Sequence, residues 1–169
     1  DQEGAVVNFE RGGEVIYRVK VKTPDYLRML RLMIECSYAG TAEMVDAHPE
    51  WAGWRDLEAH LKALGREDAP EELLAAYREY YEEHAAYLAD CERLRAWAEE
   101  TCRGLKARLG GPAADAPAFR KAFAAVAVGL PYPGLVFAAL DGRLTLDRVR
   151  KIIRTPAEAR TALAAVRGT

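Results

Sequence analysis

The chain has 169 residues, 50% of them hydrophobic, which predicts a soluble globular protein with one core or a small domain plus an appendage. The net charge of −2 is unevenly distributed along the chain. Residues 1–100 carry 12 Lys and Arg against 22 Asp and Glu, whereas residues 101–169 carry 12 Lys and Arg against 4 Asp and Glu. We therefore expect a polyanion to bind the basic C-terminal region, residues 101–169. Three widely spaced cysteines do not indicate a disulfide framework or a zinc knuckle and favour the cytoplasm. Prolines and glycines in the apolar run 122–140 favour two short buried helices over a membrane span.

The first expected elements are two β-strands, Glu3–Phe9 and Glu14–Lys22, which are rich in Val, Ile, Tyr and Phe. Gly12-Gly13 lies between them and tolerates the positive φ of a tight turn. The two strands are therefore predicted to form a hairpin.

The following segments are predicted to be helical. Thr23-Pro24 supplies an N-cap and a proline suited to the first helical position, and apolar residues then recur at helical spacing over 27–38. Thr41 is expected to cap a continuation that His48-Pro49 ends, and a further helix is expected over 54–64.

The longest expected element is a helix over about 70–109. Asp68 followed three residues later by Glu71 is a capping-box pattern at its start, and apolar or aromatic residues recur along one stripe in steps of three and four. The stripe consists of Leu73, Tyr77, Tyr80, His84, Tyr87, Cys91, Leu94, Ala98, Cys102 and Leu105. Its tyrosines fit two interpretations, a helix face packed in a core and a platform on which nucleic-acid bases stack.

Four shorter helices are predicted after it, at 116–128, 133–140, 146–153 and 156–166. Thr155 and Glu158 form a second capping box before the last of them. No β pattern follows the hairpin. The predicted fold class is therefore mainly α, with a short N-terminal hairpin in residues 1–24 and an all-helical domain in residues 25–169.

The predicted hairpin has two chemically different faces. If Gly12-Gly13 is a two-residue turn, Lys20 pairs with Ala5 and Lys22 with Glu3. One face then carries Glu3, Arg18, Lys20 and Lys22, and the other carries Val15, Tyr17, Val19 and Val21. The apolar face is expected to pack into a sheet, and the charged face to look into a cleft or into solvent.

These residues resemble two motifs of the covalent nucleotidyltransferases, the superfamily of ATP-dependent ligases and capping enzymes. Glu3-Gly4-Ala5-Val6 is similar to the Glu-Gly-x-Val motif IV, and Lys20-Val21-Lys22 to the Lys-x-Lys motif V, in the same order and at a short separation. Helices are expected after motif V here, as in the phage-type RNA ligase 1 family, whose helical C-terminal domain continues directly from that motif. The resemblance implies that the hairpin is the edge of a nucleotidyltransferase sheet.

The resemblance also implies an activity. The complete enzyme would use ATP and Mg²⁺ to join a 3′-hydroxyl to a 5′-phosphate of RNA through a lysyl-AMP intermediate. Lys20 and Lys22 would contact the α-phosphate of ATP and of the adenylated lysine, and Glu3 would bind the ribose or divalent-metal region. Two ammonium groups on one strand face suit this chemistry, because negative charge builds on the phosphate oxygens during transfer.

The nucleophilic lysine of the family belongs to a Lys-x-x-Gly motif upstream of motif IV. Lys62-Ala63-Leu64-Gly65 matches that pattern, but it follows motif V and lies at a predicted helix end, so we expect it to have no catalytic part. The chain is therefore expected to be the C-terminal part of a longer enzyme, inactive without the preceding nucleotidyltransferase domain. The three histidines lack metal-ligand spacing, and no metal site is predicted.

The basic end carries the candidate RNA-binding residues. Arg150 and Arg154 are four apart and Arg148 and Lys151 three apart, so two neighbouring helix ridges carry positive charge. A solvated surface and a site for RNA phosphates, including those of a tRNA, both fit this pattern. The alternative function, from a different class, is a non-catalytic helical module that binds RNA or protein and whose hairpin only resembles the motifs.

Overall fold

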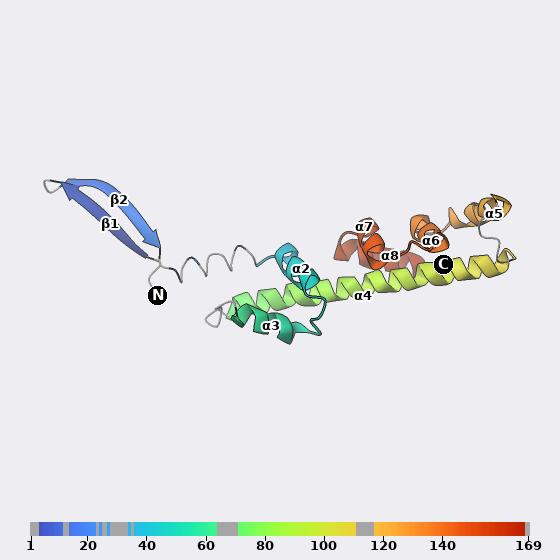
Figure 1. Cartoon of the computed structure of the whole chain (residues 1–169), viewed down its shortest axis with the longest axis horizontal. Coiled ribbons are helices and arrows are strands. Elements are labelled where there is room, and N and C mark those ends of the chain that lie inside the picture. Colours follow the sequence, from blue (N-terminus) through green and yellow to red (C-terminus); the bar gives the residue numbers. More distant parts are fainter. Residues whose placement is uncertain are drawn as a thin grey trace. The chain divides into compact units, whose positions relative to one another are not determined.

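The structure is a computed structural model that describes residues 4–11, 14–22, 24, 27, 34, 36–63, 71–110 and 117–167. It is mainly helical and begins with a two-stranded antiparallel hairpin (Figure 1). The chain divides into two compact units, Asp1–Glu82 and Glu83–Thr169, with the boundary inside one long helix. The domain boundary expected near residue 24 stays a prediction.

The hairpin consists of strands β1 (Gly4–Arg11) and β2 (Glu14–Lys22). Arg11 pairs with Glu14, as predicted for a two-residue turn. The register shifts at the next step, because Tyr17 and Val15 pair with consecutive residues of β1 and Ile16 is left as an extra residue. The result is a β-bulge, in which two residues of one strand oppose one of the other.

The bulge changes the partners of the two lysines. Each pairs one residue later along β1 than predicted, Lys20 with Val6 instead of Ala5 and Lys22 with Gly4 instead of Glu3. The predicted register is therefore wrong beyond the bulge, since a one-residue shift brings a residue of the opposite parity across from each lysine. Glu3 itself lies outside the described residues.

Two helices of the first unit follow, α2 (Tyr38–Ala47) and α3 (Trp54–Ala63). The Ser37 hydroxyl caps α2 by accepting a hydrogen bond from the Gly40 amide at 3.1 Å. Thr41 is buried inside α2, so the prediction that it caps this helix is wrong. The helix begins earlier because Ser37 already satisfies a first-turn amide. His48 ends α2 as predicted.

Helix α4 (Glu71–Arg108) confirms the long helix predicted over 70–109. In the first unit, Tyr77 of α4 packs with Leu57 and Leu61 of α3 in a small core. The predicted capping residue Asp68 lies outside the described residues. Along the part of the chain that the structure describes, no helix is long and apolar enough to cross a membrane.

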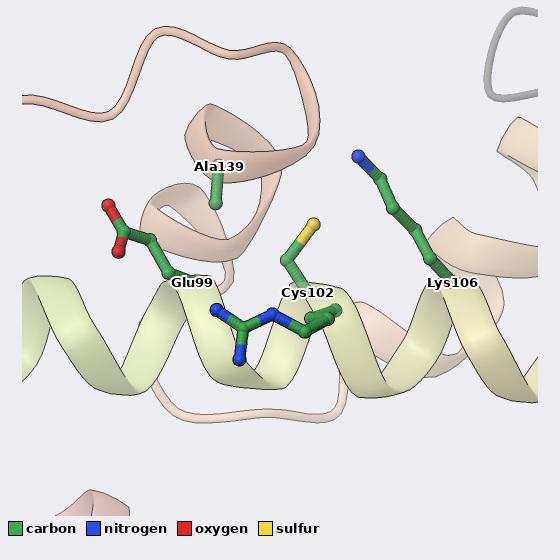
Figure 2. A pocket seen from close by; sticks show the side chains of 5 residues that line it. Glu99, Cys102, Lys106 and Ala139 are labelled. Carbon is green, nitrogen blue, oxygen red and sulfur yellow. The ribbon is translucent and has the colours of Figure 1, made fainter. Parts of the chain in front are cut away.

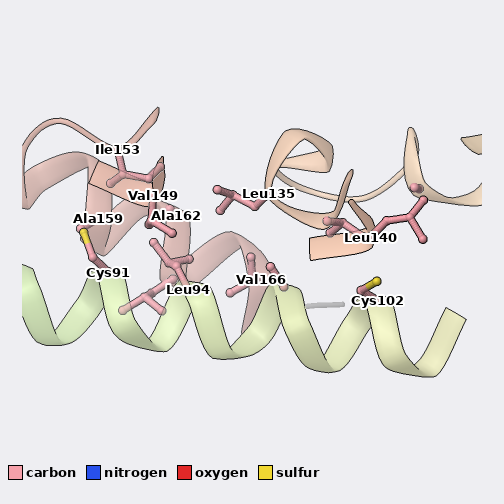
Figure 3. Packing of buried hydrophobic residues seen from close by; sticks show 14 of the residues in the cluster. Cys91, Leu94, Cys102, Leu135, Leu140, Val149, Ile153, Ala159, Ala162 and Val166 are labelled. Carbon is pink, nitrogen blue, oxygen red and sulfur yellow. The ribbon is translucent and has the colours of Figure 1, made fainter. Parts of the chain in front are cut away.

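The second unit contains the rest of α4 and four shorter helices. They are α5 (Pro117–Ala127), α6 (Pro133–Leu140), α7 (Leu146–Ile152) and α8 (Pro156–Arg167), each within one residue of its prediction at either end. Cys91, Leu94 and Cys102 of α4 point toward apolar side chains of these helices (Figure 3). The predicted stripe is thus a core face, and Tyr77 and Tyr87 are buried in it.

The start of α8 follows its predicted capping box in part. The Glu158 amide donates a hydrogen bond to the Thr155 hydroxyl at 3.2 Å. The Glu158 carboxylate reaches back one residue further than the usual box, and accepts a hydrogen bond from the Arg154 amide at 2.6 Å. This contact anchors the turn between α7 and α8.

Candidate functional site

The two candidate catalytic lysines lie on β2, two residues apart, so their side chains project from the same strand face. Lys20 is exposed and Lys22 half-buried, and the exposed Arg18 continues the row. A step of two residues along a strand is about 7 Å, which places three positive charges in line. This row can contact neighbouring phosphate groups of a nucleotide.

The other hairpin face was expected to pack into a sheet. Val21, which alternates with the lysines and belongs to that face, is 49% exposed. A two-stranded hairpin is marginally stable alone and gains stability from further strands or a covering helix. The exposure of Val21 is what we expect of a hairpin face that packs against a further apolar surface.

Lys62, the lysine of the Lys-x-x-Gly match, lies near the end of α3 and is exposed. Its Nζ lies 2.8 Å from the Glu58 carboxylate one turn earlier. The hydrogen bond from Lys62 lowers the pKa of Glu58. An exposed lysine paired with a carboxylate is outside the desolvated surroundings that activate a nucleophilic amine.

Three of the four candidate RNA contacts face solvent. Arg148 and Lys151 are exposed on α7, and Arg154 is exposed just beyond its C-cap. Val149 and Ile153 occupy the opposite side of the helix and are buried in the core of the second unit. The amphipathic pattern of α7 therefore orients these three cations outward.

Arg150 has different surroundings. Its guanidinium carbon lies 6.0 Å from the centre of the Tyr87 ring on α4, within the range of a cation–π contact. The Tyr87 hydroxyl donates a buried hydrogen bond of 2.7 Å to the carbonyl of Ile153. Burial raises the pKa of Tyr87 to about 12. No pattern in the sequence indicated this contact, which attaches α7 to α4 and gives Arg150 a structural role. Its RNA contact stays a prediction.

Four arginines of α4 form ion pairs with carboxylates three or four residues away, whereas the exposed Arg108 at the end of the helix has no ion pair among the described residues. The ion pairs are Arg78–Glu82, Arg93–Asp90, Arg95–Glu92, Arg95–Glu99 and Arg103–Glu100. Arg120 and Arg143 share Asp141, and their hydrogen bonds, that of Arg143 first, lower the pKa of its carboxyl. Arg148, Lys151 and Arg154, by contrast, have no carboxylate at ion-pair distance among the described residues.

A cavity of about 240 Å³ lies between α4 and α6 (Figure 2). Glu99, Cys102, Arg103, Lys106 and Ala139 line it. Burial raises the pKa of the Cys102 thiol, which is therefore protonated at neutral pH and a poor nucleophile. The Cys102 thiol is therefore not assigned a catalytic part.

A second cluster joins the end of α2 to α3. The ring of His48 stacks on Trp51 with centroids 4.2 Å apart, and His60 lies 5.1 Å from both rings. Glu50 hydrogen-bonds the His48 ring at 2.8 Å. In the described ranges, no three His, Cys, Asp or Glu side chains come together to hold a metal ion.

Comparison with protein-family models, with curated proteins and with solved structures finds no match for this chain. Two groups of cations among the described residues are placed to contact an anion, the lysine row of β2 and the outward cations of α7.

Proposed function

We propose that the chain is part of an ATP-dependent RNA ligase in which the hairpin contacts the nucleotide and the helical region contacts RNA. One observation carries the proposal: Lys20 and Lys22 share a strand face, and the chain continues from that strand into a mainly helical region. The resemblance to motif V and to the helical domain of the phage-type RNA ligase 1 family supports the same order of parts.

The chemistry assigned to the lysines is electrostatic. In adenylation, a lysine of the preceding nucleotidyltransferase domain attacks the α-phosphorus of ATP, and pyrophosphate leaves. Lys20 and Lys22 would donate hydrogen bonds to the α-phosphate oxygens, where negative charge builds. The two lysines leave the strand about 7 Å apart, and their long side chains can converge on one phosphate group. Mg²⁺, when bound with ATP, supplies further neutralisation of those phosphates.

The RNA contact is assigned to the second unit. Arg148, Lys151 and Arg154 lack ion-pair partners among the described residues, whereas four of the arginines of α4 are paired with carboxylates. Cations left uncompensated on one surface favour binding of a polyanion. The net charge of the sequence from residue 101 onward is also positive.

The test is RNA sealing by the protein as its own gene encodes it, with every segment that precedes the hairpin. A labelled RNA with a 5′-phosphate and a 3′-hydroxyl should be ligated in the presence of ATP and Mg²⁺, and the Lys22→Ala variant should lose this activity. RNA binding without sealing by the wild-type protein would contradict the ligase and favour the second candidate. That candidate is a non-catalytic RNA-binding module, supported by the outward cations of α7.

A further inference from the structure

Ile152 is the feature of α7 that charge alone does not explain. Its side chain is 41% exposed, whereas its neighbours Val149 and Ile153 are 0% and 2% exposed. It lies four residues after Arg148 and directly after Lys151, so the three side chains share the solvent side of the helix. With Arg154 they form the α7 surface.

The neighbours of Ile152 distinguish it from an ordinary exposed hydrophobic residue. Single apolar side chains on a surface are common and do not by themselves indicate a binding site. Here the apolar group lies among three cations that have no carboxylate at ion-pair distance within the described ranges. Asp147 is the acidic residue of α7, and it lies in the first turn. The α7 surface thus combines cations that form no ion pair among the described residues with an accessible apolar group.

The attachment of α7 to α4 holds this orientation. The hydrogen bond from Tyr87 to the Ile153 carbonyl fixes the end of the helix, and Arg150 lies over the Tyr87 ring. With Val149 and Ile153 directed into the core, Ile152 cannot turn inward without unpacking the helix.

We propose that the α7 surface binds single-stranded RNA, with Ile152 packed against an unpaired base or ribose and the three cations on adjacent phosphates. The proposal rests on the RNA contact of the proposed function and deepens it by naming the state of the strand. In an RNA duplex, the base faces are stacked and hidden, and only phosphates and groove edges are accessible. An apolar side chain among phosphate contacts therefore gains most from an unpaired nucleotide.

The experiment is a titration of the protein with a fluorescent single-stranded RNA of 12 nucleotides and with a blunt duplex, each at several salt concentrations. The wild-type protein should bind the single strand more tightly. Ile152→Ala should weaken single-strand binding by about 3- to 10-fold and leave the salt slope unchanged, because apolar contact releases no counterions. Arg148→Ala should instead lower the slope by about 0.7.

Val128→Ala is the matched control, since Val128 is 64% exposed in the same unit and follows α5. It should leave both affinities unchanged. Equal binding of duplex and single strand, an Ile152→Ala variant with wild-type affinity, or displacement of the RNA by an equal concentration of poly-glutamate would overturn the inference while leaving RNA binding intact. No binding of either RNA at low salt would instead contradict the RNA contact of the proposed function, and the inference with it.

Discussion

The side chains of Arg148 and Arg150 lie two residues apart on α7 and meet different surroundings. Two steps along an α-helix turn a side chain by about 200°, so one arginine faces solvent and the other faces Tyr87 of α4. A guanidinium beside an aromatic ring stabilises packing as well as carrying charge. The number of basic residues in this segment therefore overstates the number of phosphate contacts it can make.

The lysine row of the hairpin leads to the first prediction. In the proposed complete enzyme, Lys20→Ala or Lys22→Ala should reduce adenylation or sealing by roughly 10²-fold or more, because each removes a charge that the proposal directs at the transferring phosphate. Lys62→Ala is the control and should retain activity, since its ammonium is paired with Glu58. The rates are measured with α-labelled ATP and a labelled RNA. Equal losses in all three variants would show that the motif alignment is wrong.

The buried hydrogen bond of Tyr87 leads to a second prediction. Tyr87→Phe should lower the free energy of unfolding by about 1–2 kcal/mol, because the Ile153 carbonyl loses its buried donor. Tyr80→Phe on the same helix is the control, since Tyr80 is only half-buried, and it should change the free energy little. Urea unfolding followed by circular dichroism measures both. A wild-type midpoint for Tyr87→Phe would show that this bond does not hold α7 in solution.

The same tyrosine gives a pH dependence. Burial raises the pKa of Tyr87 from 10.0 to about 12 in the folded protein. The protonated form is thus favoured by folding, so the stabilisation is complete below pH 10 and is lost as the pH rises through 12. The unfolding free energy of the wild type should fall more steeply between pH 10 and 12 than that of Tyr87→Phe. Parallel profiles would contradict the burial of this hydroxyl.

At the scale of elements, α4 and α7 differ in whether their basic residues form ion pairs with carboxylates. On α4, arginines alternate with carboxylates at three- and four-residue spacing and form ion pairs along the exposed side. Each exposed pair contributes little to stability, but it reduces the local field. On α7, the sequence from Leu146 to Ile152 contains one acidic and three basic residues. The ratio of basic to acidic residues is therefore higher on α7 than along the paired stretch of α4.

This difference predicts which helix contributes to RNA affinity. The double variant Arg148→Ala/Lys151→Ala should lower the salt slope of single-stranded RNA binding by about 1.4, because two phosphate contacts are lost. Arg93→Ala/Arg103→Ala removes two paired arginines from α4 and serves as the control of equal charge change. Its slope should match the wild type. An equal decrease in both variants would indicate a general effect of net charge rather than contacts made by α7.

At the scale of the whole molecule, each of the two units has its own core. The core of the first unit centres on Leu57, Leu61 and Tyr77. The second unit contains a larger core, to which α4 and all four later helices contribute. The lysine row belongs to the first unit and the α7 surface to the second, so the two proposed contacts are built on separate packing units.

The proposed function predicts that this chain by itself does not form a lysyl-AMP intermediate. It carries the phosphate-contacting lysines, whereas the proposal assigns the nucleophile to a preceding domain. Incubation with α-labelled ATP and Mg²⁺ should therefore leave no acid-stable label on the chain. Covalent AMP on Lys62, detected by peptide mass spectrometry, would contradict the proposal and make the Lys-x-x-Gly match a true nucleophile.

The elements and their order could be read from the sequence. Helical periodicity located the long helix and its buried stripe, and proline, glycine and threonine signals located the shorter helices to within one residue. These signals are local, because capping and periodicity act within one or two turns of a residue. The turn pairing of Arg11 with Glu14 was predicted for the same reason.

The tertiary structure decided the features that depend on contacts between elements. The bulge at Ile16 reset the partners of both lysines, since register depends on cross-strand packing that no single-strand pattern reveals. Whether Arg150 meets solvent or Tyr87 depended on where α7 packs on α4. A helical pattern shows which face of a helix is apolar, but the neighbour that covers that face comes from elsewhere in the chain. For this reason the sequence by itself located the candidate cations, and only the packed structure separated those that face solvent from the one that helps to hold α7 in place.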